Sequence, residues 1–126
     1  MKRILFFSIF FVITVQLAAQ SFVALRDSFL YYEYTDTTKA KEFLAQYYKK
    51  TIKLDDKQRL AEYYLLKGWF LQDRSDFYAA LENFRKSAEV AKKYGYLQRE
   101  ADAYGNIGNI YDDLSDDVKR MEYQQL

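Results

Sequence analysis

The side chains that could carry out chemistry in this 126-residue sequence are carboxylates, amines and tyrosines, because it contains no cysteine and no histidine. Their absence excludes thiol and imidazole nucleophiles, Ser-His-Asp triads, disulfides and zinc-finger sites. The densest polar group is the acidic run at residues 112–117 (DDLSDD), which lacks the alternating ligands, central glycine and distal glutamate of a calcium loop. We therefore predict no metal site, no cofactor and no enzymatic activity, and interpret the run as an acidic helix end followed by a helix N-cap.

Residues 1–19 are predicted to be a signal peptide. Met1-Lys2-Arg3 is a short basic start, and Ile4 to Leu17 is an apolar run of secretory length. A membrane-spanning helix would need roughly 20 such residues. Ala18-Ala19 then precedes the expected cleavage before Gln20. We expect an exported protein of the periplasm or cell envelope, and the alternative is an uncleaved N-terminal membrane anchor.

The charge of the chain argues against nucleic-acid binding. The whole chain has a net charge of +1, from 19 basic and 18 acidic residues. Removing Lys2 and Arg3 with the leader leaves 17 basic residues and a net charge of −1. Because the basic and acidic residues are interspersed, we expect no nucleic-acid partner and no membrane contact by the mature segment.

The rest of the chain repeats with a period of 40 residues. A 40-residue shift aligns identical residue types at Asp36, Asp76 and Asp116, at Ala40 and Ala80, at Tyr64 and Tyr104, and at Gly68 and Gly108. Repeat periods of 20–50 residues are typical of solenoids. Apolar residues recur at three- and four-residue steps over 61–73 and 77–91, so each unit is predicted to contain two helices.

Helix ends can also be predicted from local residues. Ser75 or Asp76 is expected to cap the second helix of its unit, and Thr35-Asp36 and Ser115-Asp116 occupy the same register. Lys92-Lys93 followed by Gly95 predicts that this helix ends near Tyr94.

These residues resemble the tetratricopeptide repeat family. The matching elements are Tyr64-x₂-Lys67-Gly68-x₂-Leu71 followed by Ala80-x₃-Phe84, and the stretch from Ala103 to Tyr111. The 40-residue unit is similar to the extended class of that family, whose helices are longer. The resemblance implies an all-α solenoid of antiparallel helix pairs, about three in number, with the last one incomplete. The expected organisation is a divergent N-terminal repeat at 20–60, a repeat at 61–100 and a partial repeat at 101–126.

Two sets of residues follow from this resemblance. Small and aromatic side chains are expected to pack the repeats together, at Ala40, Tyr64, Gly68, Ala80, Phe84, Tyr104, Gly108 and Tyr111. Family members bind peptides in a concave groove lined by the first helix of each pair. The corresponding groove candidates are Glu62, Leu65, Trp69, Gln72, Asp73, Asp102, Asn106, Asn109, Asp112 and Asp113. Asn106 has an equally supported alternative role as a hydrogen bond within the scaffold. Trp69 is either a groove anchor or a residue that packs against the first repeat, and packing is favoured.

The resulting expectation is an exported, non-catalytic scaffold that binds a protein or peptide. Exported arrays of this type resemble the N-terminal region of bacterial sensor histidine kinases and transcriptional regulators, which suggests a sensor region or a fragment of one. The alternatives are a structural subunit of an envelope assembly and, less favoured, a carboxylate-dependent hydrolase. Because the third helix pair is incomplete, self-association through an open C-terminal end is a further expectation.

Overall fold

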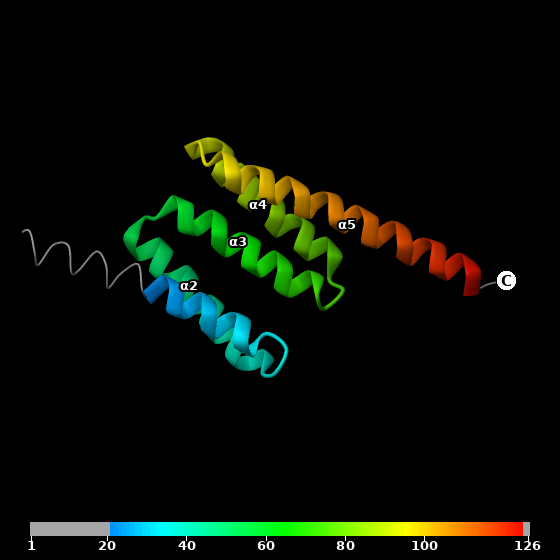
Figure 1. The fold of residues 1–126 in the computed structure, drawn as a ribbon, viewed down its shortest axis with the longest axis horizontal. Helices are drawn as coiled ribbons and strands as arrows, with labels where there is room; N and C mark the ends of the chain where they lie inside the picture. The colour runs from blue at the N-terminus through cyan, green and yellow to red at the C-terminus, as the bar shows by residue number, and fades with distance from the viewer. Residues whose placement is uncertain (1–20, 125–126) are drawn as a thin grey trace, which may run out of the picture. The chain divides into compact units, whose positions relative to one another are not determined.

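The computed structural model describes residues 21–124, all of whose regular structure is helical, so the predicted signal peptide lies outside the described residues. A helix at 21–32 is followed by α2 (Thr37–Leu54), α3 (Lys57–Gln72), α4 (Phe77–Tyr94) and α5 (Leu97–Gln124), as Figure 1 shows. None of the helices in this part of the chain is long and apolar enough to span a membrane. The chain divides into two compact units between Tyr47 and Tyr48.

The first unit contains the helix at 21–32 and most of α2, which run antiparallel. The turn between them is closed by Asp36, whose side chain accepts a hydrogen bond from the Lys39 backbone N–H over 3.1 Å. Phe22 packs edge-on against Tyr47, with 5.1 Å between ring centroids. Ala40 is fully buried. The prediction of two helices around Asp36, with a small packing residue at Ala40, is confirmed.

The second unit is built on the antiparallel hairpin of α3 and α4, with α5 packed mainly on α4. At the centre of the hairpin, a Cβ placed on Gly68 would lie 2.3 Å from Cε1 of Phe84. A side chain at residue 68 would therefore force the helices apart, which confirms Gly68 and Phe84 as packing residues. The surrounding core consists of Leu65, Ala80, Leu81, Phe84, Ala88, Ala103 and Ile110.

The 40-residue period is visible in the helix bounds. Residues 37–54 of α2 and 77–94 of α4 are offset by 40 positions, and so are the first residues of α3 and α5. The residues that end α2 and α4 are also equivalent, because Asp55 and Gly95 both have positive φ, at 51° and 77°. Asp76 caps α4 by accepting from the Ala79 backbone N–H, as predicted, and α4 ends at Tyr94.

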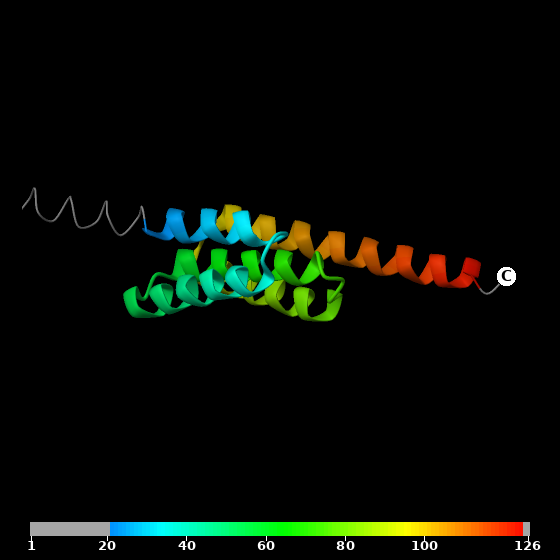
Figure 2. The same ribbon diagram turned by 90° about the horizontal axis from the view of Figure 1, so that it is seen from below.

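The predicted break at Ser115-Asp116 is wrong, because α5 runs without interruption to Gln124. Two differences explain the continuation. At the α3–α4 turn the Arg74 guanidinium donates to the Phe70 carbonyl oxygen over 2.9 Å, and leucine occupies the equivalent position 114. The segment after α3 brings Phe77 and Ala80 into the core, whereas the segment after 116 offers aspartate and arginine at those positions. Without apolar residues at these two positions a folded-back segment would bury less apolar surface, and the helix continues past the ends of α3 and α4 (Figure 2).

Candidate functional site

Five of the ten predicted groove residues bond to one another along the facing sides of α3 and α5, namely Trp69, Gln72, Asp102, Asn106 and Asp113. A sixth, Glu62, forms ion pairs with two arginines. Glu62 is 3% exposed, and its carboxylate accepts from Arg59 Nη1 over 2.8 Å and lies 3.3 Å from Arg99 Nη2. Two arginines thus compensate one buried carboxylate, an arrangement that holds the start of α5 against α3. Glu62 is a structural ion-pair residue, which corrects its prediction as a groove-facing one.

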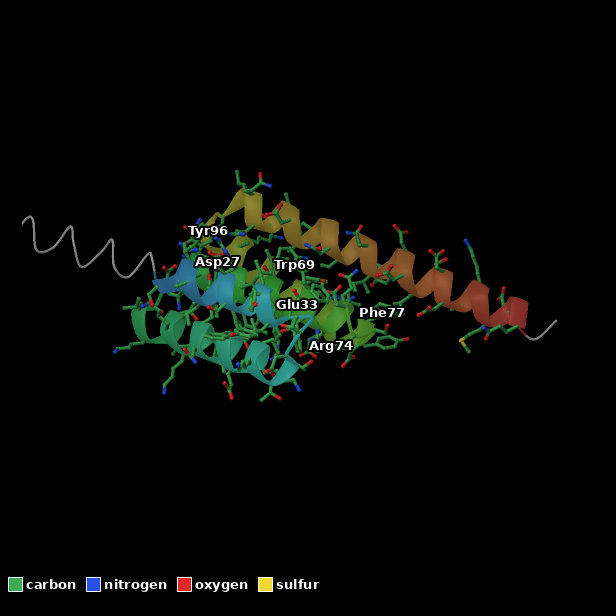
Figure 3. All side chains as sticks on the ribbon, turned by 60° about the horizontal axis from the view of Figure 1, so that its bottom comes forward. Asp27, Glu33, Trp69, Arg74, Phe77 and Tyr96 are labelled. Carbon is green, nitrogen blue, oxygen red and sulfur yellow. The ribbon has the colours of Figure 1, made fainter. Side chains whose placement is uncertain are left out.

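The single tryptophan joins the middle of the two helices. Trp69 projects from α3 (labelled in Figure 3), and its indole Nε1 donates to the side-chain oxygen of Asn106 over 2.8 Å. The amide nitrogen of Asn106 in turn donates to the backbone carbonyl of Asp102, also over 2.8 Å. Both polar ends of the Asn106 side chain are therefore used inside the scaffold, in agreement with its alternative role. The packing of Trp69 against the first repeat stays a prediction.

A third pair lies toward the end of α3. Gln72 Nε2 donates to Asp113 Oδ2 over 2.8 Å, across 41 residues of sequence. Asp102 accepts from Gln98 Nε2 within α5, again over 2.8 Å. Leu65 is 1% exposed and belongs to the hydrophobic core, so it does not face a groove as predicted.

Four of the groove candidates are exposed in the structure, namely Trp69, Asp73, Asn109 and Asp112. Asp73 lies at the C-cap of α3, and Asn109 and Asp112 lie on α5. The α3–α5 face is therefore a hydrogen-bonded joint with a few exposed polar groups around it.

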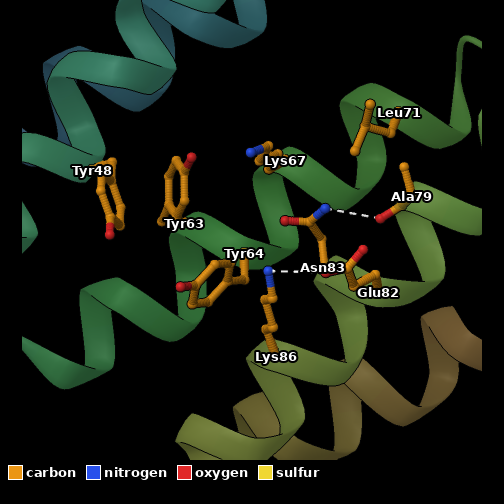
Figure 4. Close-up of a pocket in the computed structure, with 9 residues that line it drawn as sticks. All are labelled: Tyr48, Tyr63, Tyr64, Lys67, Leu71, Ala79, Glu82, Asn83 and Lys86. Carbon is orange, nitrogen blue, oxygen red and sulfur yellow. Dashed lines mark hydrogen bonds and ion pairs between the residues drawn. The ribbon is translucent and has the colours of Figure 1, made fainter.

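A groove that the sequence did not identify lies between α3 and α4 in the second unit. It has a volume of about 520 Å³ and is lined by Tyr48, Tyr63, Tyr64, Lys67, Leu71, Ala79, Glu82, Asn83 and Lys86 (Figure 4). Tyr63 packs between the rings of Tyr48 and Tyr64, at centroid distances of 4.7 and 5.3 Å. The adjacent tyrosines Tyr63 and Tyr64 can be seen in the sequence, but the arrangement of the three rings also depends on Tyr48 of α2.

Two ionisable groups of this groove, Tyr63 and Lys86, are poorly suited to act as general bases at neutral pH. Burial raises the pKa of the Tyr63 hydroxyl above 10.0, and the neighbouring tyrosines Tyr64 and Tyr48 raise it further. The hydrogen bond from Lys86 to Glu82, 3.1 Å long, raises the pKa of the Lys86 ammonium. Tyr63 therefore stays neutral and Lys86 stays charged near pH 7, so neither can act as a general base there.

A second groove follows the boundary between α4 and α5. It has a volume of about 250 Å³ and is lined by Arg85, Ala88, Glu89, Lys92, Tyr104 and Ile107. On its α5 side, Tyr104 and Tyr111 are 52% and 51% exposed, and a Cβ on Gly108 would meet no atom within 4 Å. These three residues were predicted to pack against a following helix. Because α5 does not turn back, they are exposed on its surface instead.

The acidic run at 112–117 lies within the continuous part of α5, so Asp116 is not an N-cap. Among residues 21–124 there is no group of three or more metal-ligating side chains placed to hold an ion. The second unit therefore contains a hydrogen-bonded joint between α3 and α5 and two open grooves that α4 helps to line.

In comparisons with known proteins, no protein-family model, no curated protein and no solved structure matches the chain.

Proposed function

We propose that the chain is an exported, non-catalytic protein-binding scaffold with the architecture of an extended tetratricopeptide repeat array, and that it docks a partner helix beside α5. The offset of 40 residues between α2 and α4, and between the starts of α3 and α5, supports the repeat architecture. Each repeat in such an array buries its apolar face against a neighbouring repeat.

One observation carries the docking proposal. Eight residues on one face of α5 are all exposed and follow one another at alternating steps of four and three. They are Leu97, Ala101, Tyr104, Gly108, Tyr111, Ser115, Val118 and Glu122, and we call them the α5 stripe. Steps of four and three are the spacing with which one helix packs along another. Six of the eight are apolar or glycine, which is unusual for a face that is open to water.

The neighbouring helix supplies the second wall of the docking site. Ala88 and Lys92 of α4 line the α4–α5 groove together with Tyr104 of the stripe. Arg85 donates from Nη2 to the Tyr111 hydroxyl over 3.1 Å, which fixes the tyrosine beside α4. A helix lying on the stripe would contact both α4 and α5, as the next helix of a repeat array would. The α3–α5 face is less suitable, since its polar groups already bond to one another.

Site-specific photo-crosslinking in the cells that produce the full chain tests this function. A photoreactive phenylalanine analogue is placed at Tyr104, and at Tyr78 in a control variant, since Tyr78 is 78% exposed near the start of α4. We expect a discrete adduct from residue 104, absent from residue 78, that is lost when Tyr111→Lys is added. Absence of any discrete adduct at 104, or equal adducts at both positions, would rule the docking surface out.

A further inference from the structure

The exposed α5 stripe has a counterpart on α3 that is already covered by another helix. Three residue types of the stripe recur 40 positions earlier, and the identical pairs are Ala61 and Ala101, Tyr64 and Tyr104, and Gly68 and Gly108. In α3 the alanine is 0% exposed and the glycine is buried, whereas both are exposed in α5. At these positions the two helices therefore differ in what covers them and not in residue type.

The helix that covers α3 is α4, and it does so through three contacts. The ring of Phe84, which is fully buried, lies over Gly68 so closely that a Cβ on the glycine would come within 2.3 Å of it. Ala80, one turn earlier and also fully buried, lets the two backbones approach. Ser87 Oγ donates to the Ala61 backbone oxygen over 2.7 Å. These contacts describe the kind of helix that fits such a surface.

The equivalent space on α5 is open. A Cβ on Gly108 would meet no atom of the chain within 4 Å. Tyr104 and Tyr111 lie one turn to either side of this glycine and are each about half exposed. The residues that follow, up to Gln124, continue α5 and do not return to cover it. The stripe thus has room for an aromatic ring between two tyrosines, as α3 has for Phe84.

We propose that the α5 stripe binds a helix of another polypeptide that carries the contact residues of α4. These are a small residue, a phenylalanine four positions later and a serine three positions after that. The bound helix lies antiparallel to α5, with its phenylalanine over Gly108 and its serine hydroxyl on the Ala101 backbone oxygen. The inference rests on the proposed function, because it specifies the partner helix that the docking surface binds.

The charges on the two sides of the stripe describe this helix further. The α4 edge of the groove carries two basic residues and one acidic residue, namely Arg85, Lys92 and Glu89. Ile107 lines the same groove and marks the α4 side of α5. At 100° per residue, the exposed Asp112 and Asp116 fall on the other side of the stripe. We therefore expect acidic side chains on the flank of the partner helix that faces α4 and basic ones on its opposite flank.

A helix as long as α4 has enough surface for a weak specific complex. Its 18 residues span about 27 Å, and a helix face is about 10 Å wide, so α5 alone would cover about 270 Å² of it. Because the bound helix also lies against α4, about 540 Å² is buried on each partner and about 1,080 Å² in total. This exceeds the lower limit of about 1,000 Å² for specific interfaces. We expect an affinity in the micromolar range, which titration can measure.

A synthetic peptide with the α4 sequence tests the proposal directly. The peptide comprises residues 75–95, which retain the Asp76 N-cap and the Gly95 C-cap. It carries a fluorophore and is titrated with the full chain, and the anisotropy reports binding. We expect saturable binding that Phe84→Ala in the peptide weakens at least about tenfold. Alanine has the higher helix propensity, so this loss cannot come from unfolding of the peptide.

The matched control in the peptide is Tyr78→Ala, because Tyr78 is 78% exposed when α4 is packed in the chain. We expect this variant to bind as the native peptide does. Equal weakening by Phe84→Ala and Tyr78→Ala would contradict the placement of the phenylalanine ring over the glycine. Absence of saturable binding by the native peptide would overturn the proposal.

Variants of the full chain locate the binding site. Gly108→Leu fills the space over residue 108 and is expected to abolish peptide binding, with the helical circular dichroism of the native chain retained. Asn109→Leu adds the same side chain at the next residue, which is exposed and outside the stripe, and should bind as the native chain does. A peptide that displaced α4 from α3 would be insensitive to Gly108→Leu. Binding that survives this substitution would therefore overturn the proposal.

Failure of this inference can be distinguished from failure of the proposed function. The adduct captured in cells from residue 104 is digested, and the crosslinked segment is sequenced. A segment without the small residue, phenylalanine and serine at these spacings would retain the docking surface and exclude the α4-like helix. If no adduct forms, the proposed function fails, and the peptide titration still decides whether the stripe binds a helix of this kind.

Discussion

The indole nitrogen of Trp69 and the side-chain oxygen of Asn106 lie 2.8 Å apart and join α3 to α5 across 37 residues of sequence. Asn106 also donates to the Asp102 carbonyl, so it connects the tryptophan to the backbone of α5. Two side chains that the family resemblance assigns to ligand binding therefore hold two helices together.

Replacing Asn106 should weaken this connection in a way that can be observed directly. Asn106→Ala is expected to lower the free energy of unfolding by about 1 kcal/mol, since it removes an acceptor from the indole N–H. Because the chain has one tryptophan, its single indole N–H resonance reports the bond, and its hydrogen exchange should accelerate. Asn109→Ala, on an exposed position of α5, serves as control. Unchanged exchange in Asn106→Ala would contradict the structural role.

The contact between Gly68 and Phe84 predicts that one added methyl group destabilises the chain at residue 68 but not at an open position of α5. Gly68→Ala would place Cβ 2.3 Å from the Phe84 ring, and overpacking of this kind costs about 1–3 kcal/mol. Gly105→Ala, on α5, meets no atom within 4 Å and should instead stabilise the chain by about 0.5–1 kcal/mol through helix propensity. Urea unfolding followed by circular dichroism compares the two. Equal shifts of both midpoints would contradict the packing described.

Removing the buried carboxylate of Glu62 should lower the free energy of unfolding more than removing an exposed carboxylate does. Glu62→Ala leaves Arg59 and Arg99 without their shared partner in a mostly buried position, and we expect a loss of about 3 kcal/mol. The matched control is Glu82→Ala, which breaks the exposed pair with Lys86 and should cost less than about 1 kcal/mol. Comparable losses in denaturant unfolding would argue against the burial of Glu62.

The raised pKa of Tyr63 predicts a loss of stability at alkaline pH. The folded chain holds the Tyr63 proton more tightly than the unfolded chain, whose tyrosine titrates near 10.0. The contribution is fully present below pH 10 and is lost as the pH rises through the higher folded value. The free energy of unfolding, measured between pH 8 and 11, should therefore fall less steeply with pH in Tyr63→Phe than in the native chain. Tyr78→Phe, at an exposed position, should keep the native slope.

The features that could be predicted from sequence are those set by neighbouring residues. Asp36 and Asp76 cap helices because their side chains reach an N–H group three residues along, and Gly95 ends α4 because it accepts a positive φ. The 40-residue period then predicted which segments of the chain form equivalent helices. Gly68 was identified as a packing residue because glycine recurs 40 residues later at Gly108 and because Ala80-x₃-Phe84 follows it in the family pattern.

The features that could not be predicted depend on what a segment would bury. Ser115-Asp116 matches Ser75-Asp76 letter for letter, yet only the latter is followed by residues that pack into a core. Local signals carry no information about that difference. The same holds for Trp69 and Gln72, whose partners lie 37 and 41 residues away and are met only when α5 docks.

The order in which the helices pack has a consequence for folding speed. In the second unit α4 packs on α3 and α5 packs on α4, so each helix rests mainly on its neighbour in sequence. Such a topology has a low contact order, and chains of this kind close short loops before they gain packing energy. We expect the second unit to fold in microseconds to milliseconds, and its last helix, added from one side only, to be the first to open to hydrogen exchange.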